Sequence, residues 1–302
     1  MRPGPPATSM PIPRKSVHPT YRETARPTIL SAIGIGSGRH RCHKARGGPP
    51  TRAPGRRGVI ENGRRHVSKG DDGLHPEGLH RDGLHRSADI RPQAIIFDFD
   101  GVILDSARLK TQAFADCYAG EAEETIAEVV AYQDRHGGVG RREKFAHYER
   151  ELFGRPGDPA ALDALCRRFA ELIDTAMMEA PFIPGAVQVL AALHGCLPLH
   201  LVSGMPETEL RVLLARRGLD GFFASVAGTP RLKLPEFRRI LADENLAPGE
   251  VLAVGDARTE FDAAMELGIP FLAIVAEGAP DFFPADVPRH RDLSGFLDFV
   301  AR

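Results

Sequence analysis

The chain has 302 residues, of which 42% are hydrophobic and 26% charged, with four cysteines and a formal net charge of −1 at pH 7. No apolar run approaches the roughly 20 residues that a membrane-spanning helix needs, and no charged-then-apolar signal peptide stands at the start. The cysteines are far apart and form no C-x-x-C pair, which argues against a structural zinc site and an oxidising compartment. We therefore expect a soluble, cytoplasmic protein without a membrane partner.

The near-neutral total conceals two parts of opposite charge. Residues 1–92 carry 18 Lys and Arg against 7 Asp and Glu, a net charge of +11, whereas residues 93–302 carry 21 against 33, a net charge of −12. The first part also holds 12 Pro and 13 Gly, and Tyr21 is its only aromatic residue. So little apolar material cannot offset a backbone ordering entropy of about 1–2 kcal/mol per residue. We predict that residues 1–92 form a disordered, basic, Pro/Gly/Arg-rich extension.

This extension could bind a metal, act as a transit peptide, bind nucleic acid, or have no function. A Gly-Leu-His repeat places His75, His80 and His85 five residues apart, but no Cys or carboxylate cage accompanies them for a metal. The first 46 residues have the composition of a transit peptide, but their prolines oppose an amphipathic helix. The basic charge would attract nucleic acid, yet the aromatic residues that stack on bases are missing. We interpret the segment as a dispensable extension, for which upstream sequence translated from a misassigned start is one open explanation, and expect no nucleic-acid partner.

From residue 93 onward, short apolar runs alternate with amphipathic stretches, a pattern typical of a parallel sheet with helices on both faces. We predict strands at residues 94–98, 199–203, 223–228, 251–256 and 271–275. We predict helices at residues 185–195, 206–218, 235–245 and 259–268, three of which are followed or ended by a glycine that can stop a helix. The predicted fold is therefore an α/β, Rossmann-like core.

Residues 107–180 break this alternation, because they show helical periodicity without a convincing strand. Interruptions at residues 136–140 and 154–159 divide them into three or four helices. We predict an inserted helical cap at 107–180, and a catalytic core formed by residues 93–106 and 181–302. Since the insert leaves directly after the first strand, we expect its helices to cover the loop that follows that strand.

Polar residues follow several of the predicted strands. Ligands of open parallel sheets bind beyond the carboxyl ends of the strands, where these residues would meet. They are Asp98 and Asp100 after the first strand, Ser203 and Gly204 after the second, Lys233 in the loop after the third, and Asp256 and Glu260 after the fourth.

These residue types suit phosphate chemistry around a metal. Carboxylates at one rim repel one another unless a cation lies between them, and oxygen ligands favour Mg²⁺. A carboxylate can attack phosphorus where a metal, a lysine such as Lys233 and donors such as Ser203 neutralise the phosphoryl charge. Asp100 points the other way along an extended backbone from Asp98 and can act as general acid. Gly101 then lets the chain turn sharply.

The segments "FDFDGVILDS", "LVSG" and "VGDARTEFDAA", together with Lys233, resemble the four motifs of the haloacid dehalogenase superfamily of phosphohydrolases. The helical insert resembles the cap of its phosphoglycolate phosphatase-like branch. The resemblance implies roles for each residue that matches a motif. Asp98 would be the nucleophile, Asp100 the general acid/base, Asp98, Asp100 (through its carbonyl), Asp256 and Glu260 the Mg²⁺ site, and Ser203, Gly204 and Lys233 the phosphoryl site.

Three positions depart from the pattern of the superfamily. Glu260 stands where an Asp is common, although its longer side chain can still reach a metal-bound water. Ala257 replaces a common Ser, and "LPEF" follows Lys233 where the family often has a Pro-rich variant. None of these changes removes a group that the chemistry requires.

The stretch "HGGVGRREKF" at residues 136–145 is where we expect substrate selection. Arg141 and Lys144 lie three residues apart and would share a helix face, from which they could bind a carboxylate or second phosphate of the substrate. His136 is a further candidate.

The sequence predicts a Mg²⁺-dependent phosphatase that acts on a small phosphorylated metabolite through phospho-Asp98. A phosphomutase resembling beta-phosphoglucomutase would use the same core residues and stays open. A metal-free dehalogenase is disfavoured by Asp100 and Asp256, and a phosphonatase would need Lys110 or Lys144 to form a Schiff base. A non-enzymatic, nucleic-acid-binding scaffold is disfavoured by the intact acidic residues. The substrate and the oligomeric state are not specified.

Overall fold

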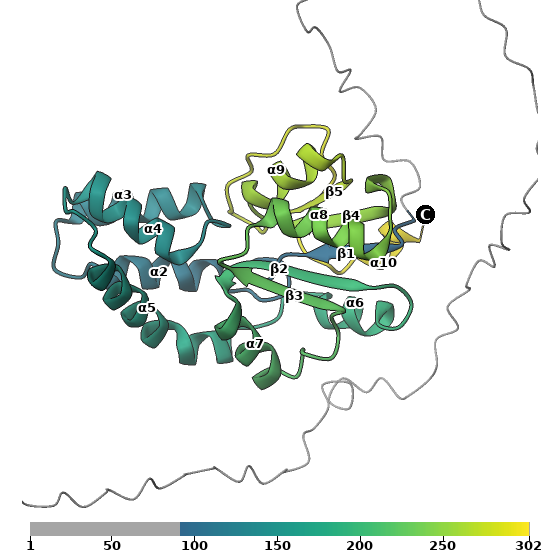
Figure 1. The fold of residues 1–302 in the computed structure, drawn as a ribbon, viewed down its shortest axis with the longest axis horizontal. Helices are drawn as coiled ribbons and strands as arrows, with labels where there is room; N and C mark the ends of the chain where they lie inside the picture. The colour runs from purple at the N-terminus through teal and green to yellow at the C-terminus, as the bar shows by residue number, and fades with distance from the viewer. Residues whose placement is uncertain (1–90, 302) are drawn as a thin grey trace, which may run out of the picture. The chain divides into compact units, whose positions relative to one another are not determined.

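The computed structural model describes residues 91–301, which contain a sheet of six parallel strands in the order β3-β2-β1-β4-β5-β6 (Figure 1). The strands are β1 (Ala94–Phe97), β2 (Leu199–Pro206), β3 (Ser225–Thr229), β4 (Val251–Gly255), β5 (Phe271–Ile274) and β6 (Arg289–His290). The five predicted strands and the parallel sheet are confirmed. β6 was not predicted, because its two residues are polar and partly exposed and form no apolar run. The predicted N-terminal extension, with its three repeated histidines, lies outside the described residues except for its last two.

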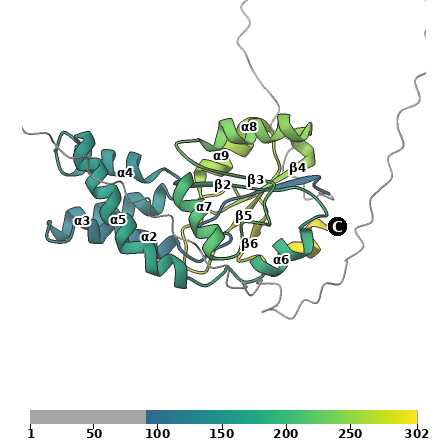
Figure 2. The same cartoon turned by 60° about the horizontal axis from the view of Figure 1, so that its bottom comes forward.

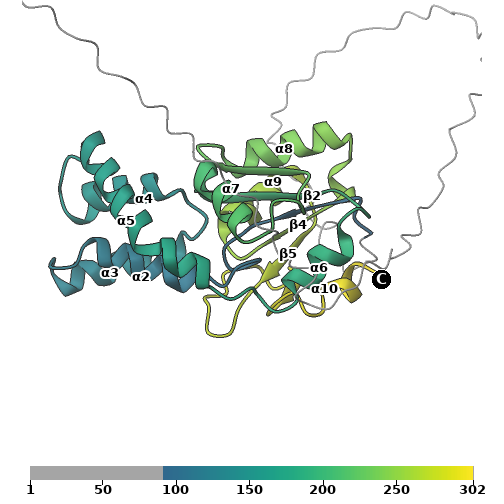
Figure 3. The ribbon, with the colours of Figure 1, turned by 90° about the horizontal axis from the view of Figure 1, so that it is seen from below.

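Both faces of the sheet are covered by helices. The four residues of β1 are at most 1% exposed, as expected for a parallel strand between two helical layers. One face carries α8 (Lys233–Glu244) and α9 (Arg258–Leu267), which pack Phe237 and Ala264 against Ile96. The other carries α6 (Ala186–Leu193), α7 (Glu207–Arg216) and α10 (Phe296–Val300), and Figure 3 shows α6 and α10 opposite α8 and α9. Phe97 points to this second face, with its ring centroid 5.8 Å from that of Phe296.

The order of the strands determines where a site can form. The chain runs outward from β1 through β2 to β3 and then returns to the other side of β1 to form β4. Such a reversal opens a crevice at the carboxyl ends of the two strands beside it. The ends of β1 and β4 therefore lie side by side at the position where ligands of these sheets bind.

The helical insert consists of α2 (Ala107–Cys117), α3 (Glu123–Arg135), α4 (Arg141–His147), a π-helical turn at Tyr148–Leu152, and α5 (Pro159–Glu179). Figure 2 shows these helices grouped beyond one end of the sheet. Their interior is aromatic: the ring of Phe114 lies 5.1 Å from that of Phe145 and 4.4 Å from that of Phe169, between centroids. The insert thus has a hydrophobic core of its own, separate from the core of the sheet.

Two chain segments that run side by side join the insert to the sheet. The N–H of Asp105 donates to the carbonyl of Pro181 at 2.9 Å, and the N–H of Ile183 donates to that of Ile103 at 3.0 Å. These bonds tie the departing and returning segments together at the base of the insert. None of the helices within residues 91–301 combines the length and apolar character that a membrane span requires.

Candidate active site

Three acidic side chains meet at the carboxyl ends of β1 and β4. Asp98 follows β1, Asp256 follows β4, and Glu260 lies in the first turn of α9; one carboxylate oxygen of each lies within 4.8 Å of the other two. The N–H of Asp98 donates to the carbonyl of Val254 at 2.9 Å, which fixes the ends of the two strands against each other. The sheet thus brings together residues up to 162 positions apart in the sequence.

Lys233 lies among these carboxylates and is itself only 7% exposed. Its Nζ is 2.9 Å from Oδ1 of Asp98 and 2.8 Å from Oε2 of Glu260. The contact with Asp98 is an ion pair rather than an aligned hydrogen bond, so Oδ1 has no hydrogen-bond partner among the described residues. The predicted loop position of Lys233 is wrong, because α8 begins at Lys233. The first turn of a helix, rather than a flexible loop, therefore holds this ammonium group.

Glu260 has partners for both of its carboxylate oxygens. Oε1 accepts from the backbone N–H of Ala257 at 2.8 Å, and Oε2 accepts from Lys233 and, at 2.7 Å, from the hydroxyl of Thr259. The bond to Ala257 closes the N-terminus of α9, where free N–H groups need acceptors. Glu260 therefore holds the lysine and the helix start in place as well as adding negative charge to the site.

The burial of these acids perturbs their titration. Burial raises the pKa of Asp98 to about 7, and the neighbouring Glu260 and Asp100 add to this effect while Lys233 opposes it. The pKa of Asp256 is raised for the same reasons, first by burial and then by Glu260 and Asp98. Burial works against the ammonium of Lys233, but Asp98 and Glu260 outweigh it and raise its pKa. Lys233 thus pairs with two of the three clustered carboxylates, and the cluster carries more acidic groups than this one lysine can neutralise.

A divalent cation fits this arrangement. All the side-chain donors in the cluster are carboxylate oxygens, which Mg²⁺ prefers, and Oδ1 of Asp98 lacks a hydrogen-bond partner among the described residues. Burial is the main reason that the pKa values of Asp98 and Asp256 are raised, and a cation among the three groups would offset this cost and the mutual repulsion that adds to it. The residues present therefore fit a Mg²⁺ site.

Gly101 allows the loop after β1 to approach Asp256. Its φ angle is +75°, a region that side chains disfavour. A Cβ atom at this position would lie 2.1 Å from Oδ2 of Asp256, well inside contact distance. The turn and the close approach both require glycine, as the sequence pattern indicated for the turn.

Asp100 is held by two side chains outside its own turn. Its Oδ1 accepts from the hydroxyl of Ser106 at 2.6 Å, and its Oδ2 forms an ion pair with Nζ of Lys110 on α2. Lys110 was not predicted to have this role. A usable signal existed, because Ser106 and Lys110 are four residues apart at the start of a helix, where such residues lie one turn apart on the same side.

Ser203 and Gly204 lie near the site, but only Gly204 borders the cavity that contains Asp98. β2 continues to Pro206 rather than ending at Ser203. Ser203 is 2% exposed, and its hydroxyl accepts from the N–H of Met205 at 3.1 Å. It lines a cavity shared with Lys233, whereas Gly204 also borders the cavity that contains Asp98.

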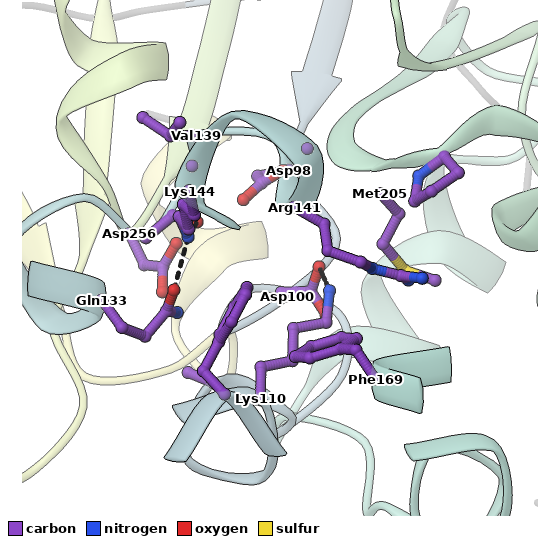
Figure 4. Close-up of a pocket in the computed structure, with 16 residues that line it drawn as sticks. Asp98, Asp100, Lys110, Gln133, Val139, Arg141, Lys144, Phe169, Met205 and Asp256 are labelled. Atoms are coloured by element: carbon purple, nitrogen blue, oxygen red, sulfur yellow. Dashed lines mark hydrogen bonds and ion pairs between the residues drawn. The ribbon is translucent and has the colours of Figure 1, made fainter. Parts of the chain in front are cut away.

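The carboxylates open into a cavity of about 60 Å³ between the sheet and the insert (Figure 4). Asp98, Asp100 and Asp256 line it from the core, and Lys110, Arg141 and Lys144 line it from the insert. A larger cavity of about 340 Å³ also borders Asp256, Gln133 and Gly137. His136 does not line the smaller cavity; its ring stacks on Tyr132 with the centroids 4.0 Å apart.

Arg141 connects the insert to the core. Its guanidinium donates to both carboxylate oxygens of Glu209 on α7, at 3.2 and 2.6 Å, and to the carbonyl of Cys166 at 3.1 Å. It also lies over the ring of Phe169, 4.6 Å from the centroid. The charge of Arg141 is therefore already compensated by an acid of the core.

Lys144 differs from Arg141 in this respect. It is 2% exposed, and its Nζ donates to Oε1 of Gln133 at 2.5 Å and to the carbonyl of Gly137 at 2.9 Å. Within residues 91–301, no carboxylate lies within ion-pair distance of it. Both partners are neutral, and an ammonium carries three N–H donors. The ammonium form of Lys144 thus has one N–H donor left over at the wall of the cavity and no carboxylate among the described residues to pair with.

The profile of the haloacid dehalogenase-like hydrolase family matches residues 92–268. This match covers more than half of the chain, and the chain belongs to this family of hydrolases. It is 29% identical over 187 residues to a phosphoglycolate phosphatase of Synechococcus elongatus, covering 60% of this chain and 83% of that protein. It is also 29% identical over 200 residues to the plasmid-encoded protein CbbY of Cupriavidus necator, covering 59% and 76%.

Solved structures share the fold. The crystal structure of CbbY from Rhodobacter sphaeroides in complex with phosphate superposes with a TM-score of 0.55 at 20% identity, covering 70% of this chain and all of that one. A predicted phosphoglycolate phosphatase from Haemophilus somnus gives 0.53 at 19% identity, covering 69% and 97%. The structural similarity to these proteins therefore includes the helical insert as well as the sheet.

We predict that Gly101→Ala destabilises the protein more than Gly120→Ala does. Both glycines have positive φ, but an added Cβ meets Asp256 at position 101 and nothing within 4 Å at position 120. We expect a loss of about 1 kcal/mol at position 120 and a further loss of about 1–3 kcal/mol at position 101 from overpacking. Urea unfolding of the two variants measures the difference, and equal losses would contradict the close approach.

Proposed function

We propose that this protein is a Mg²⁺-dependent phosphatase that hydrolyses a small phosphorylated metabolite through an aspartyl-phosphate at Asp98. The observation that carries the proposal is the position of Asp98 beside Lys233, Asp256 and Glu260 at the end of β1. A carboxylate with an ammonium group 2.9 Å away and a metal-suited cluster around it is placed to attack an anionic phosphoryl group.

In the first step, the Asp98 carboxylate attacks phosphorus and the bond from phosphorus to the ester oxygen breaks. Asp100, two residues along an extended backbone, gives a proton to the departing oxygen, so that an alcohol leaves. Lys233 stabilises the charge on the phosphoryl oxygens. A bound Mg²⁺ would neutralise further negative charge and orient the phosphoryl group. Asp98, Asp256 and Glu260 are the residues that would hold it.

In the second step, water attacks the phosphorus of the aspartyl-phosphate. Asp100, now ionised, takes a proton from this water, and the bond between Asp98 and phosphorus breaks to release inorganic phosphate. Both side chains return to their starting protonation states.

The charge distribution in the insert favours a substrate that carries a second anionic group. Lys144 offers an uncompensated positive charge at the wall of the cavity, whereas Arg141 is already paired with Glu209. A carboxylate or second phosphate that reaches Lys144 would gain a charge-assisted hydrogen bond. Relatives support this class of substrate: one is a phosphoglycolate phosphatase, and a CbbY protein of similar fold was crystallised with xylulose-1,5-bisphosphate.

A phosphomutase is the second candidate, because it would use the same core residues and the same covalent intermediate. It would return the phosphoryl group to a sugar instead of to water. Product analysis with a sugar monophosphate, in the presence and absence of a bisphosphate primer, separates the two. Release of inorganic phosphate at the rate of substrate loss supports the phosphatase, and conversion to an isomeric sugar phosphate supports the mutase.

We predict that Asp98→Asn abolishes hydrolysis while the fold remains intact. The substitution removes the attacking carboxylate and a metal ligand in one change, and a loss of at least about 1,000-fold in kcat is expected. The measurement is phosphate release from a panel of sugar phosphates, phosphoglycolate and nucleotides with Mg²⁺. Asp105→Asn, an exposed acid in the same loop, is the matched control. Near-normal turnover by Asp98→Asn would contradict a covalent mechanism.

Lys144 gives the site a pH dependence with a defined sign. Burial is the main reason that its pKa is lowered to about 7; Lys110 and Lys233 lower it further, whereas Asp100 and Asp256 oppose the shift. The ammonium form, which binds an anion, is present below this pKa and is lost above it. For a substrate with a second anionic group, kcat/KM, which reports the free enzyme, should therefore fall as the pH rises through about 7.

We predict that Lys144→Met removes this alkaline decline and raises KM by about 10- to 100-fold at low pH, the loss expected for a hydrogen bond to a charged group. Arg142→Met is the control, because Arg142 lies on the same helix but forms an ion pair with Asp163. The measurement is kcat/KM against pH for the best substrate of the panel. An unchanged profile in Lys144→Met would assign Lys144 to the packing of the insert.

A further inference from the structure

Each carboxylate oxygen of Asp100 contacts a residue at the start of the insert. The hydroxyl of Ser106 donates to Oδ1 at 2.6 Å. Nζ of Lys110 pairs with Oδ2, and Figure 4 shows Lys110 beside Asp100. The side chains of Asp100 and Lys110 are 17% and 14% exposed. With a separate partner on each oxygen, the carboxylate cannot rotate freely about its terminal torsion, which is otherwise broad.

The start of α2 positions both partners together. The N–H of Lys110 donates to the carbonyl of Ser106 at 3.1 Å, so the two residues are one helical turn apart. Residues four apart on a helix lie on the same side, and here both reach the same carboxylate. The start of α2 thus restrains the side chain of Asp100, which lies in the loop after β1.

The location of the ion pair indicates a role other than stability. A partly exposed pair contributes at most about 1 kcal/mol to folding, and both members line the cavity that also contains Asp98 and Asp256. Each carboxylate oxygen has two lone pairs, so Asp100 can keep both partners and still exchange a proton with a substrate. A fixed orientation is what a proton donor to a leaving group needs.

We propose that Lys110 is a positioning residue, which holds Asp100 in the orientation that protonates the leaving oxygen. The inference rests on the proposed function, since it assigns Asp100 as the general acid. It makes proton delivery depend on an ion pair between the core loop and the first helix of the insert. It also separates Lys110 from Lys144: the first acts on the enzyme's own acid, and the second is available to the substrate.

The leaving group of the substrate distinguishes this role from simple binding of phosphate. A p-nitrophenolate leaves without help from an acid, whereas an alkoxide requires a proton. We compare kcat/KM, which covers the steps up to transfer of phosphorus to Asp98, for p-nitrophenyl phosphate and for an alkyl phosphate. The variants of the full chain are Lys110→Met and Lys110→Arg, with Arg108→Met as the control, because Arg108 is exposed on the same helix.

For Lys110→Met, we expect kcat/KM to fall about 10- to 100-fold on the alkyl phosphate and to change less than about twofold on p-nitrophenyl phosphate. Lys110→Arg should restore most of the loss, and Arg108→Met should match the wild type on both esters. Equal losses on the two esters, or no loss on either, would overturn the positioning role. If Lys110→Met does not fold, Lys110→Arg provides the test. If Lys110 positions Asp100, this variant keeps the wild-type ratio of kcat/KM for the two esters. An altered ratio in a Lys110→Arg protein with the wild-type melting temperature would count against the positioning role. A wild-type protein inactive on both esters would instead refute the proposed function.

Discussion

The site depends on the crowding of three carboxylates around one ammonium group at the end of a parallel sheet. One carboxylate oxygen each of Asp98, Asp256 and Glu260 lies within 4.8 Å of the other two, and Lys233 forms ion pairs with Asp98 and Glu260. Burial and mutual repulsion raise the pKa values of Asp98 and Asp256, so the free arrangement stores unfavourable charge. A divalent ion would relieve this repulsion, and by adding positive charge it would also favour binding of the anionic phosphoryl group, so that the two binding events would be energetically coupled.

The insert completes the site from the opposite side, and near the site its glycine-rich loop packs closely against the core. A Cβ atom on Gly138 would lie 1.7 Å from the hydroxyl oxygen of Thr259, and one on Gly204 would lie 2.7 Å from the carbonyl of Gly138. The glycine-rich loop can therefore lie directly on the ends of β2 and α9. This close contact, with the Arg141–Glu209 ion pair beside it, accounts for the small volume of the cavity.

The sequence was sufficient for the features that depend on local pattern. Apolar runs and strand-end acids predicted five strands and the convergence of the acids after β1 and β4, because a parallel sheet leaves few alternatives for where those ends meet. The sequence was insufficient to predict features that depend on tertiary packing. The two polar residues of β6 gain strand geometry only from β5, α8 begins two residues before its expected start so that Lys233 can reach the acids, and the pairing of Arg141 with Glu209 joins segments 68 residues apart.

The most direct test of this account is the binding of Mg²⁺ to the full chain, measured by titration calorimetry. We expect one site per chain in the wild type, with the affinity weakened about tenfold or more in Asp256→Asn, since that change removes a ligand between two other carboxylates. Asp262→Asn, which alters an exposed acid on the same helix, should bind as the wild type does. Absence of binding to the wild type, or equal affinity in Asp256→Asn, would contradict the claim that these carboxylates form a cation site.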